Sequence, residues 1–199
     1  MNKINVYIAL IDLLDWTQKF IKDSNSAIDE LTDFQRFARA KLESEDRFSY
    51  VVTFADNVWV RCDQSSANDQ RLINFLDKII EVIEYANNSN LNPWCVVTSG
   101  WMTFDISDQT LVSGGNITDL RSQHILGIGE AQVRAACAEK TLKLTPCKVW
   151  VEKKLISAYG RNYVIEKEES LFGNKKWLFN DRNEFVAVLK KEKGTVLIK

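Results

Sequence analysis

Two aspartates stand where the chain is expected to turn, and both could bind a cation. Asp12 follows an almost wholly apolar stretch, residues 5–11, and Asp56 lies between two strand-like stretches, residues 48–54 and 57–62. Carboxylate oxygens are the ligands that Mg²⁺ and Mn²⁺ prefer, whereas zinc favours sulfur and nitrogen. Two carboxylates brought together repel each other unless a cation lies between them. The pair therefore indicates a divalent-metal site.

Each aspartate also has an ordinary structural explanation. Asp12 could cap a helix, and Asp56 could simply begin a turn. The metal site depends on a fold that brings the two carboxylates to one place.

The elements around the aspartates predict such a fold. Residues 5–11 are typical of a central strand buried on both faces. The two stretches that flank Asp56 predict a tight hairpin, because only two residues separate them. An amphipathic helix is predicted over residues 69–86. In a βαββαβ sheet the first strand lies beside the hairpin, so Asp12 at its end can approach the hairpin tip.

The remaining elements extend this order without dividing the chain. They are a short helix through residue 21 and a second helix after it, strands over 94–98 and on through 104, an alanine-rich helix over 130–142, a strand over 148–151, and a hairpin over 184–199 that turns at 193–194. We predict an α+β fold with a ferredoxin-like βαββαβ core, helices on one face and extra C-terminal strands. A single domain, 1–199, has its core at about 5–151 and a β extension at 152–199. That topology hosts many functions.

Composition narrows the function classes. The 199 residues include 45% hydrophobic and 27% charged residues, with a net charge of −1. Lysine and arginine are scattered, so no nucleic-acid or membrane partner is indicated. The apolar run over residues 6–14 is broken by Asp12 and is too short to span a bilayer, and no signal peptide is evident. We expect a cytoplasmic protein.

The cysteines do not indicate a zinc site. None of Cys62, Cys95, Cys137 and Cys147 forms a CxxC pair, and His124 is the sole histidine. We interpret them as reduced, buried thiols. Ser-His-Asp or Cys-His catalysis has no supporting spacing either.

Four segments, in order, resemble the motifs of class III nucleotidyl cyclases. Residues 8–17, IALIDLLDWT, resemble the first metal motif, and residues 53–58, TFADNV, resemble the second. Residues 126–139, LGIGEAQVRAACAE, resemble the later glycine-then-helix motif with its paired alanines and terminal glutamate. Residues 96–100, VVTSG, resemble the strand before it. The resemblance runs from about residue 5 to 151 and is closest to the pyrimidine cyclases of bacterial antiphage defence, which make cyclic UMP or cyclic CMP.

The resemblance implies a lyase that uses two metal ions, Mn²⁺ or Mg²⁺. Asp12, Asp56 and the carbonyl of Leu13 would hold the metals, while backbone N–H groups around Leu14, Trp16 and Thr17 would hold phosphate oxygens. The ribose 3′-hydroxyl would attack the α-phosphorus, and pyrophosphate would leave. Class III sites form between two subunits, so the resemblance also implies a homodimer with two shared sites.

The expected base is a pyrimidine. The lysine and the aspartate that read a purine in adenylate cyclases fall at Val52 and Leu126, so both polar groups are missing. Tyr50 lies on the same strand face as Val52 and could either bond a base edge or be an ordinary half-buried strand residue. The substrate would be UTP or CTP, with UTP slightly favoured.

Three departures from the family pattern leave other functions open. The transition-state asparagine and arginine fall at Val133 and Cys137, and the flexible glycine of the first motif is Asp15. Trp94 and Cys95 stand where bacterial members often carry Arg-Gly. Arg134 or Gln132 could substitute from a shifted register. The alternatives are a catalytically degenerate cyclase that acts as a nucleotide-binding or dimerisation module, and an unrelated ferredoxin-like binding module.

Overall fold

The computed structural model describes residues 2–43, 49–64, 69–104, 128–142, 146–157, 163–170 and 184–190, which form one mixed sheet with helices on both faces. The strands are β1 (Asn2–Leu14), β2 (Ser49–Phe54), β3 (Asn57–Asp63), β4 (Asn92–Phe104), β5 (Ile128–Gly129), β6 (Lys148–Glu152), β7 (Tyr163–Ser170) and β8 (Glu184–Lys190). The helices are α1 (Trp16–Lys22), α2 (Ser24–Glu43), α3 (Asp69–Asn88), α5 (Glu130–Thr141) and α6 (Lys153–Ser157).

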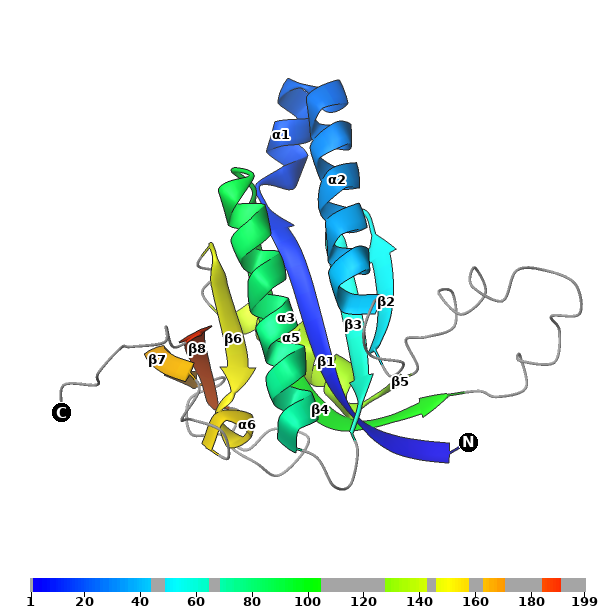
Figure 1. The fold of residues 1–199 in the computed structure, drawn as a ribbon, viewed down its shortest axis with the longest axis vertical. Helices are drawn as coiled ribbons and strands as arrows, with labels where there is room; N and C mark the ends of the chain where they lie inside the picture. Colours follow the sequence, from blue (N-terminus) through cyan, green and yellow to red (C-terminus); the bar gives the residue numbers. More distant parts are fainter. Residues whose placement is uncertain are drawn as a thin grey trace, which may run out of the picture.

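The strand order confirms the predicted fold class. The sheet runs β2-β3-β1-β4-β6-β8-β7, and β5 pairs with β4 (Figure 1). Its first four strands, with α2 and α3 as crossovers, have the order of a ferredoxin-like βαββαβ core. The pairs are antiparallel except β4 with β6, which is parallel. Strands β6, β8 and β7 widen the sheet and supply the predicted C-terminal strands.

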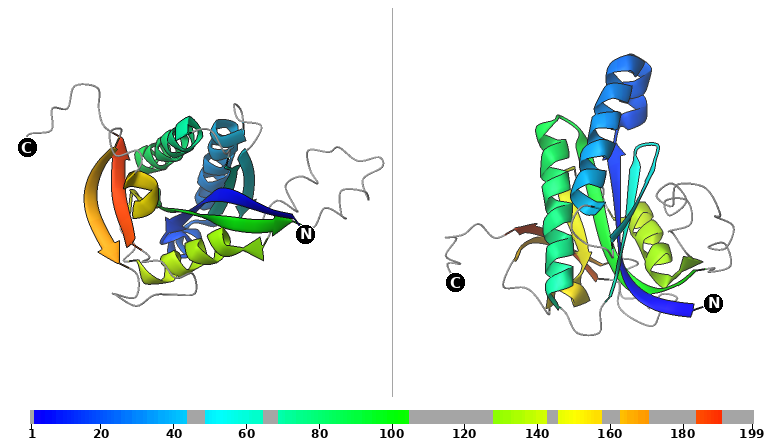
Figure 2. Two further views of the ribbon diagram at one scale, coloured as in Figure 1. Left: turned by 90° about the horizontal axis from the view of Figure 1, so that it is seen from below. Right: turned by 45° about the vertical axis from the view of Figure 1, so that its right-hand side comes forward.

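Helices lie on both faces of the whole sheet, although the two helices of the βαββαβ core share one face as predicted. Helices α2 and α3 cover one face and α5 covers the other, as the left view of Figure 2 shows. One buried cluster joins α2 and α3 to Ala9, Ile11 and Leu13 of β1. A second cluster joins α5 to Ile8 and Leu10 on the opposite side of β1. Because successive side chains of a strand alternate, a strand that is apolar at every position needs cover on both faces.

The predicted elements differ from the observed ones mainly in length. β1 has 13 residues, and β4 runs without a break through Gly100 where two strands were predicted. The hairpin of β2 and β3 and the long helix α3 are confirmed. β8 pairs with β6 and β7, whereas the predicted turn at 193–194 lies outside the described residues. None of the described helices is long and apolar enough to cross a lipid bilayer.

Candidate metal and nucleotide site

The sheet places Asp12 and Asp56 at the same edge. The antiparallel ladder between β1 and β3 ends where Ile11 faces Val58. Asp12 is the next residue of β1, and Asp56 lies in the two-residue turn just before β3. Both aspartates therefore lie just beyond the last residue pair of that ladder, at the same end of the two strands.

The pKa of Asp12 reflects both its burial and nearby negative charge. Burial raises the pKa of Asp12 to about 6, with further contributions from the negative charges of Asp56 and Glu139. A hydrogen bond with the Leu13 backbone lowers the pKa of Asp12 and so opposes these effects. Asp12 does not cap a helix, because α1 begins four residues later and its N-cap is Asp15. The arrangement favours a shared site over two unrelated turn residues.

No protein cation neutralises this pair within the described part of the chain. There, neither Asp12 nor Asp56 forms an ion pair with a lysine or arginine, and Asp56 accepts a hydrogen bond from the Asn57 amide at 3.2 Å. The same residues contain no group of three or more His, Cys, Asp or Glu side chains that could hold a metal ion. Two carboxylates fit Mg²⁺ or Mn²⁺, which keep several waters and share phosphate ligands with a substrate.

The Leu13 carbonyl is directed toward Asp56 by strand geometry. Leu13 faces Pro93 in the register of β1 and β4, and the carbonyl of Pro93 points the other way, accepting from the Cys147 amide at 2.6 Å. Two residues that face each other in an antiparallel ladder either exchange backbone hydrogen bonds or both direct their N–H and C=O groups away from each other. Leu13 therefore presents its N–H and C=O on the β3 side, beyond the end of that ladder. A backbone oxygen there can complete a site with the two carboxylates.

Leu14, Trp16 and Thr17, which are predicted to bind phosphate, lie at the β1–α1 junction, and their side chains differ in exposure. Trp16 is 9% exposed and packs in the core beneath α2 and α3, so only its backbone is available to a ligand. Leu14 is half-buried and Thr17 is exposed. Asp15 adopts a left-handed conformation, φ 63°, which glycine adopts more readily than other residues. A pocket of about 350 Å³ borders this junction, and its walls are Leu13, Leu14, Asp15, Trp16, Gln18, Lys19, Lys22, Asn90, Leu91 and Asn92.

The predicted base-reading strand keeps its alternation. Val51 is buried beneath α2, whereas Val52 is half-buried on the other face, opposite Trp59 of β3. Tyr50 lies in β2 opposite Arg61. Leu126, the other position expected to read the base, lies outside the described residues.

Helix α5 carries the largest correction to the predicted site. Val133 is 37% exposed and Cys137 is half-buried, so neither supplies a polar group where the family pattern has asparagine and arginine. Arg134, which was expected to be able to substitute, is buried and paired with Glu130 and Glu152. It is held inside the protein and cannot reach a substrate in this conformation.

Sequence reasoning missed a third acidic residue near the site. Glu139 adds to the negative field at Asp12, although it lies far away in the chain, on α5. The only sequence signal was its place as the terminal glutamate of the glycine-then-helix segment. All four cysteines are free thiols, as predicted, but Cys137 and Cys147 are only partly buried.

Solved structures with the same fold are nucleotidyl cyclase domains. The adenylyl cyclase CyaB from P. aeruginosa superposes with a TM-score of 0.69 at 11% identity, over 98% of this chain and 98% of that one. The guanylyl cyclase domain of the RhoGC fusion protein from the aquatic fungus Blastocladiella emersonii, in a dimeric form, gives 0.68 at 14% identity, over 96% and 99%. The guanylate cyclase domain of RhGC from Catenaria anguillulae, in complex with GTP, gives 0.59 at 16%, over 96% and 100%.

Sequence comparison adds nothing to this structural likeness. No family model matches the chain, and no curated protein matches it. At 9–16% identity the neighbours establish the fold, which is that of a nucleotidyl cyclase domain over nearly the whole chain.

Proposed function

We propose that this chain is a nucleotidyl cyclase that converts a pyrimidine nucleoside triphosphate to its 3′,5′-cyclic monophosphate and pyrophosphate. One observation carries the proposal: Asp12 and Asp56 lie at the same end of a cyclase-type sheet, and the negative charge of Asp56 adds to the effect of burial in raising the pKa of Asp12. Within the described residues no lysine or arginine offsets that charge. A divalent cation that arrives with a triphosphate would do so.

The chain's own residues would bind and align the reacting groups. The two carboxylates and the Leu13 carbonyl form an oxygen-lined end to β1, to which Mn²⁺ or Mg²⁺ would supply charge neutralisation and an acidified 3′-hydroxyl. The backbone at Leu14, Trp16 and Thr17 faces the polyphosphate. The 3′-oxygen bonds to the α-phosphorus, the bond to the bridging oxygen of the β-phosphate breaks, and pyrophosphate leaves. Alignment and electrostatic stabilisation account for most of the rate in such reactions.

A second copy of the chain would complete the site. Phe54, at the hairpin tip beside Asp56, is 76% exposed, and Val133 on α5 is 37% exposed. Phe54 lies on the same strand face as Val52, and Val133 lies on α5 itself. Two apolar side chains beside a charged site favour burial against another subunit. We therefore propose a homodimer with two shared sites, in which the partner supplies groups that α5 lacks.

The pyrimidine preference rests on β2. An apolar Val52 beside Trp59 offers no charge to read the polar edge of a purine. UTP is favoured over CTP only slightly. The resemblance to antiphage cyclases makes an infection signal in bacteria the proposed role of the cyclic product.

A catalytically inactive nucleotide-binding module is the second candidate. Its support is the loss of polar groups at Val133 and Cys137 together with the burial of Arg134. Such a protein would bind a triphosphate tightly and release it unchanged.

The two candidates separate in one experiment. The purified chain is incubated with Mn²⁺ and each of the four nucleoside triphosphates, and cyclic products are identified by mass spectrometry beside thermal shifts. Cyclic UMP or cyclic CMP from wild type, and none from Asp56→Ala, supports the enzyme. Stabilisation by one triphosphate without product supports the binding module. Purine products would overturn the pyrimidine assignment.

A further inference from the structure

Trp94, on β4, places a polar N–H group in the hydrophobic core. Its side chain is fully buried, and within the ranges of the chain that the structure describes its indole Nε1 forms no hydrogen bond. A buried N–H without an acceptor costs about 1–3 kcal/mol, and such a group in a folded protein calls for an explanation. A phenylalanine or leucine would fill a core position without that cost.

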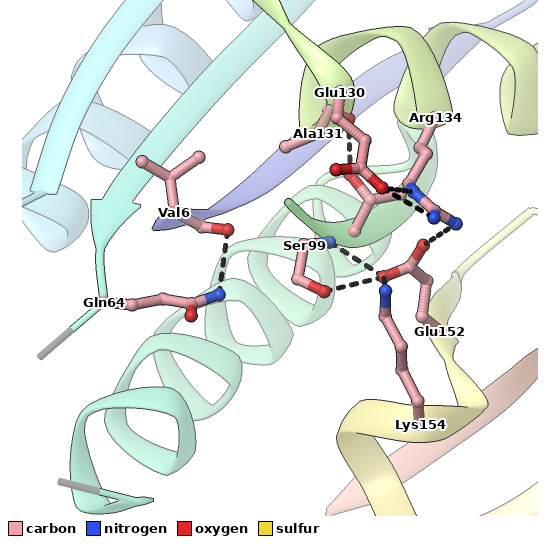
Figure 3. A network of polar contacts seen from close by, with 9 residues as sticks. Val6, Gln64, Ser99, Glu130, Ala131, Arg134, Glu152 and Lys154 are labelled. Atoms are coloured by element: carbon pink, nitrogen blue, oxygen red, sulfur yellow. Dashed lines mark hydrogen bonds and ion pairs between the residues drawn. The ribbon is translucent and has the colours of Figure 1, made fainter. Parts of the chain in front are cut away.

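Elsewhere on β4, buried polar groups have their partners. The Ser99 amide and hydroxyl donate to Glu152 Oε2 at 2.8 and 2.9 Å (Figure 3). The Arg134 guanidinium donates to Glu152 Oε1 at 3.3 Å and to Glu130 Oε1 at 2.7 Å. The contrast with this paired network makes the Trp94 N–H a candidate for a role in another state of the protein.

The two ladders of β4 show which side chains face Trp94. Asp12 of β1 is directly opposite Trp94 in the antiparallel ladder, and Lys148 of β6 is its partner in the parallel ladder. Facing residues of an antiparallel pair project from the same face of the sheet, with Cβ atoms about 4.5–5.5 Å apart. A lysine ammonium only donates hydrogen bonds, whereas a carboxylate accepts them. Of these two polar neighbours, Asp12 is therefore the one that can accept from the Trp94 N–H.

Packing leaves the Trp94 indole less freedom than the Asp12 carboxyl group. Trp94 belongs to the buried cluster that contains Ala135 and Ala138 of α5, and close-packed core side chains keep well-defined rotamers. Asp12 is only half-buried, just beyond the end of the ladder with β3. The movement needed to join the two groups is a rotation of the Asp12 side chain, without a change of the backbone.

An aspartate can bind a cation and accept a hydrogen bond at the same time. Its two oxygens offer about four lone-pair positions, so one oxygen can bind a metal while the other accepts from an N–H. Carboxylates that bind metals are themselves hydrogen-bonded, which fixes their orientation, and loss of such an outer partner lowers metal affinity by about 10- to 100-fold.

We propose that the Trp94 indole N–H donates to the Asp12 carboxylate when Asp12 binds its divalent cation, and so orients that carboxylate toward the metal. The inference rests on the proposed function, because it takes Asp12 to be a metal ligand. Trp94 acts only through Asp12 and is a positioning residue.

The direct test follows the Trp94 indole N–H by NMR. The full-length protein, labelled with ¹⁵N in its six tryptophans, is titrated with Mg²⁺, and the Trp94 resonance is assigned through its own backbone amide. We expect Mg²⁺ to move the Trp94 indole proton downfield and to slow its exchange with water, because a hydrogen bond to a carboxylate is strong and protects the proton. Asp12→Asn, which removes the ionised acceptor, should abolish both effects.

Mn²⁺ affinity gives an independent measure with a matched control. Trp94→Phe keeps an aromatic ring but removes the N–H, and should weaken Mn²⁺ binding by about 10-fold, as followed by electron paramagnetic resonance. Trp150→Phe makes the same change in the same buried cluster, at a position that faces Val96 and Ala187 instead of Asp12. It should lower the melting temperature by a similar amount but leave Mn²⁺ affinity unchanged. In the Asp12→Asn background, Trp94→Phe should cause no further loss.

Three results would overturn the proposal. They are an indole proton that Mg²⁺ leaves unshifted in wild type, a shift that persists in Asp12→Asn, and equal Mn²⁺ affinity in wild type and folded Trp94→Phe. The NMR comparison of wild type with Asp12→Asn does not depend on the folding of either tryptophan variant.

Asn92 is the competing acceptor, because it lies two residues before Trp94 on the same face of β4 and is exposed. Asn92→Ala should leave the Mg²⁺-dependent shift intact. Loss of the shift in this variant would assign the hydrogen bond to Asn92 and would also overturn the proposal.

Turnover separates this inference from the proposed function. If wild type binds Mn²⁺ with the expected dependence on Trp94 but cyclises no triphosphate, the proposed function fails and the positioning role of Trp94 stands. If a cyclic product forms and Trp94→Phe binds Mn²⁺ as wild type does, the positioning role alone fails.

Discussion

Among the described residues, carboxylates come together at the start of α5 and at the end of β1, and the two regions differ in whether a protein cation accompanies them. At the start of α5, Glu130 and Glu152 share the Arg134 guanidinium. At the end of β1, Asp12 and Asp56 repel each other, and the described residues provide no lysine or arginine partner. The protein completes the first region by itself. The second region is the one that we propose a divalent cation from outside completes.

The pKa shifts show the same contrast. Burial raises the pKa of Glu152, but Lys154, Arg134 and the two Ser99 hydrogen bonds all oppose the shift. Burial also raises the pKa of Asp12, and there two further carboxylates add to the shift while only a backbone hydrogen bond opposes it. A carboxylate whose pKa is raised by other carboxylates, with no cation to offset them, is a candidate for a functional site. A carboxylate whose charge is offset by cations and hydrogen bonds is more typical of a structural role.

Removing either carboxylate at the end of β1 should have the largest effect. Asp12→Asn and Asp56→Asn should each lower kcat by about 1,000-fold or more, because each removes one of the two carboxylates proposed to hold the metal ions. The double variant should be little worse than either single variant, since the two groups act as a unit. Product formation by mass spectrometry measures this, with the exposed Asp33→Asn on α2 as the matched control.

Independent, multiplying losses at Asp12 and Asp56 would contradict a shared cation. So would full activity in either single variant.

Removing the Arg134 guanidinium should leave the carboxylates at the start of α5 without their shared cation, as Asp12 and Asp56 are at the end of β1. Arg134→Met removes the buried cation that Glu130 and Glu152 share, leaving only the exposed Lys154 as a charged partner of Glu152, and should lower the free energy of unfolding by about 3–5 kcal/mol. Urea titration measures the loss. Arg36→Met, at an exposed i,i+3 pair on α2, should cost less than about 0.5 kcal/mol. Equal losses in the two variants would show that the buried network is not structural.

Asp12 and Asp56 should make the metal-free protein less stable as pH rises. The pKa of Asp12 is about 6 in the folded chain and near 3.8 when unfolded, so the folded state binds more protons between these values. Stability contributed by the protonated form is therefore lost as pH increases through that window. With allowance for solvent screening, Asp12→Asn should gain about 1–2 kcal/mol at neutral pH.

Below about pH 4 the gain from Asp12→Asn should vanish, because the wild-type carboxyl is then protonated in both states. Chemical denaturation in the presence of a chelator, at several pH values, measures the difference. A gain that does not depend on pH would contradict the assigned cause.

The smallest effect concerns the turn that presents Asp56. Ala55 has a φ of 49°, a left-handed conformation that favours glycine, and its carbonyl accepts from the Gln35 amide at 2.6 Å. Ala55→Gly should stabilise the protein by about 0.5–1 kcal/mol with turnover preserved. Asp15→Gly, at φ 63°, should gain less, because aspartate tolerates this conformation better than alanine does. Thermal melts of the two variants compare them, and destabilisation by Ala55→Gly would contradict the strain.

The sequence could predict the site's framework because its signals are local. A continuous apolar strand that ends at Asp12, and a hairpin with only two residues in its turn, determine β1 and the β2–β3 pair. The βαββαβ order then places the strand end beside the turn. Ala55 and Asp15 both adopt a left-handed backbone conformation, which side-chain identity alone did not indicate.

What the sequence could not predict depends on contacts between distant elements. The apolar character of β1 at every position required helices on both faces, but nothing local assigned α5 to the second face. Arg134 looked available to a substrate because its partner Glu152 is on another element. Glu139 approaches Asp12 only through the docking of α5. Long-range pairing of charges leaves no periodic signal in a single sequence.

The most direct test of the shared cation is a crystal structure with Mn²⁺ and a UTP analogue whose α,β-bridge cannot be cleaved. The anomalous signal of manganese should lie within about 2.3 Å of a carboxylate oxygen of Asp12 and of Asp56, with phosphate oxygens completing the coordination. Manganese bound elsewhere, or a triphosphate seated away from both aspartates, would contradict the account.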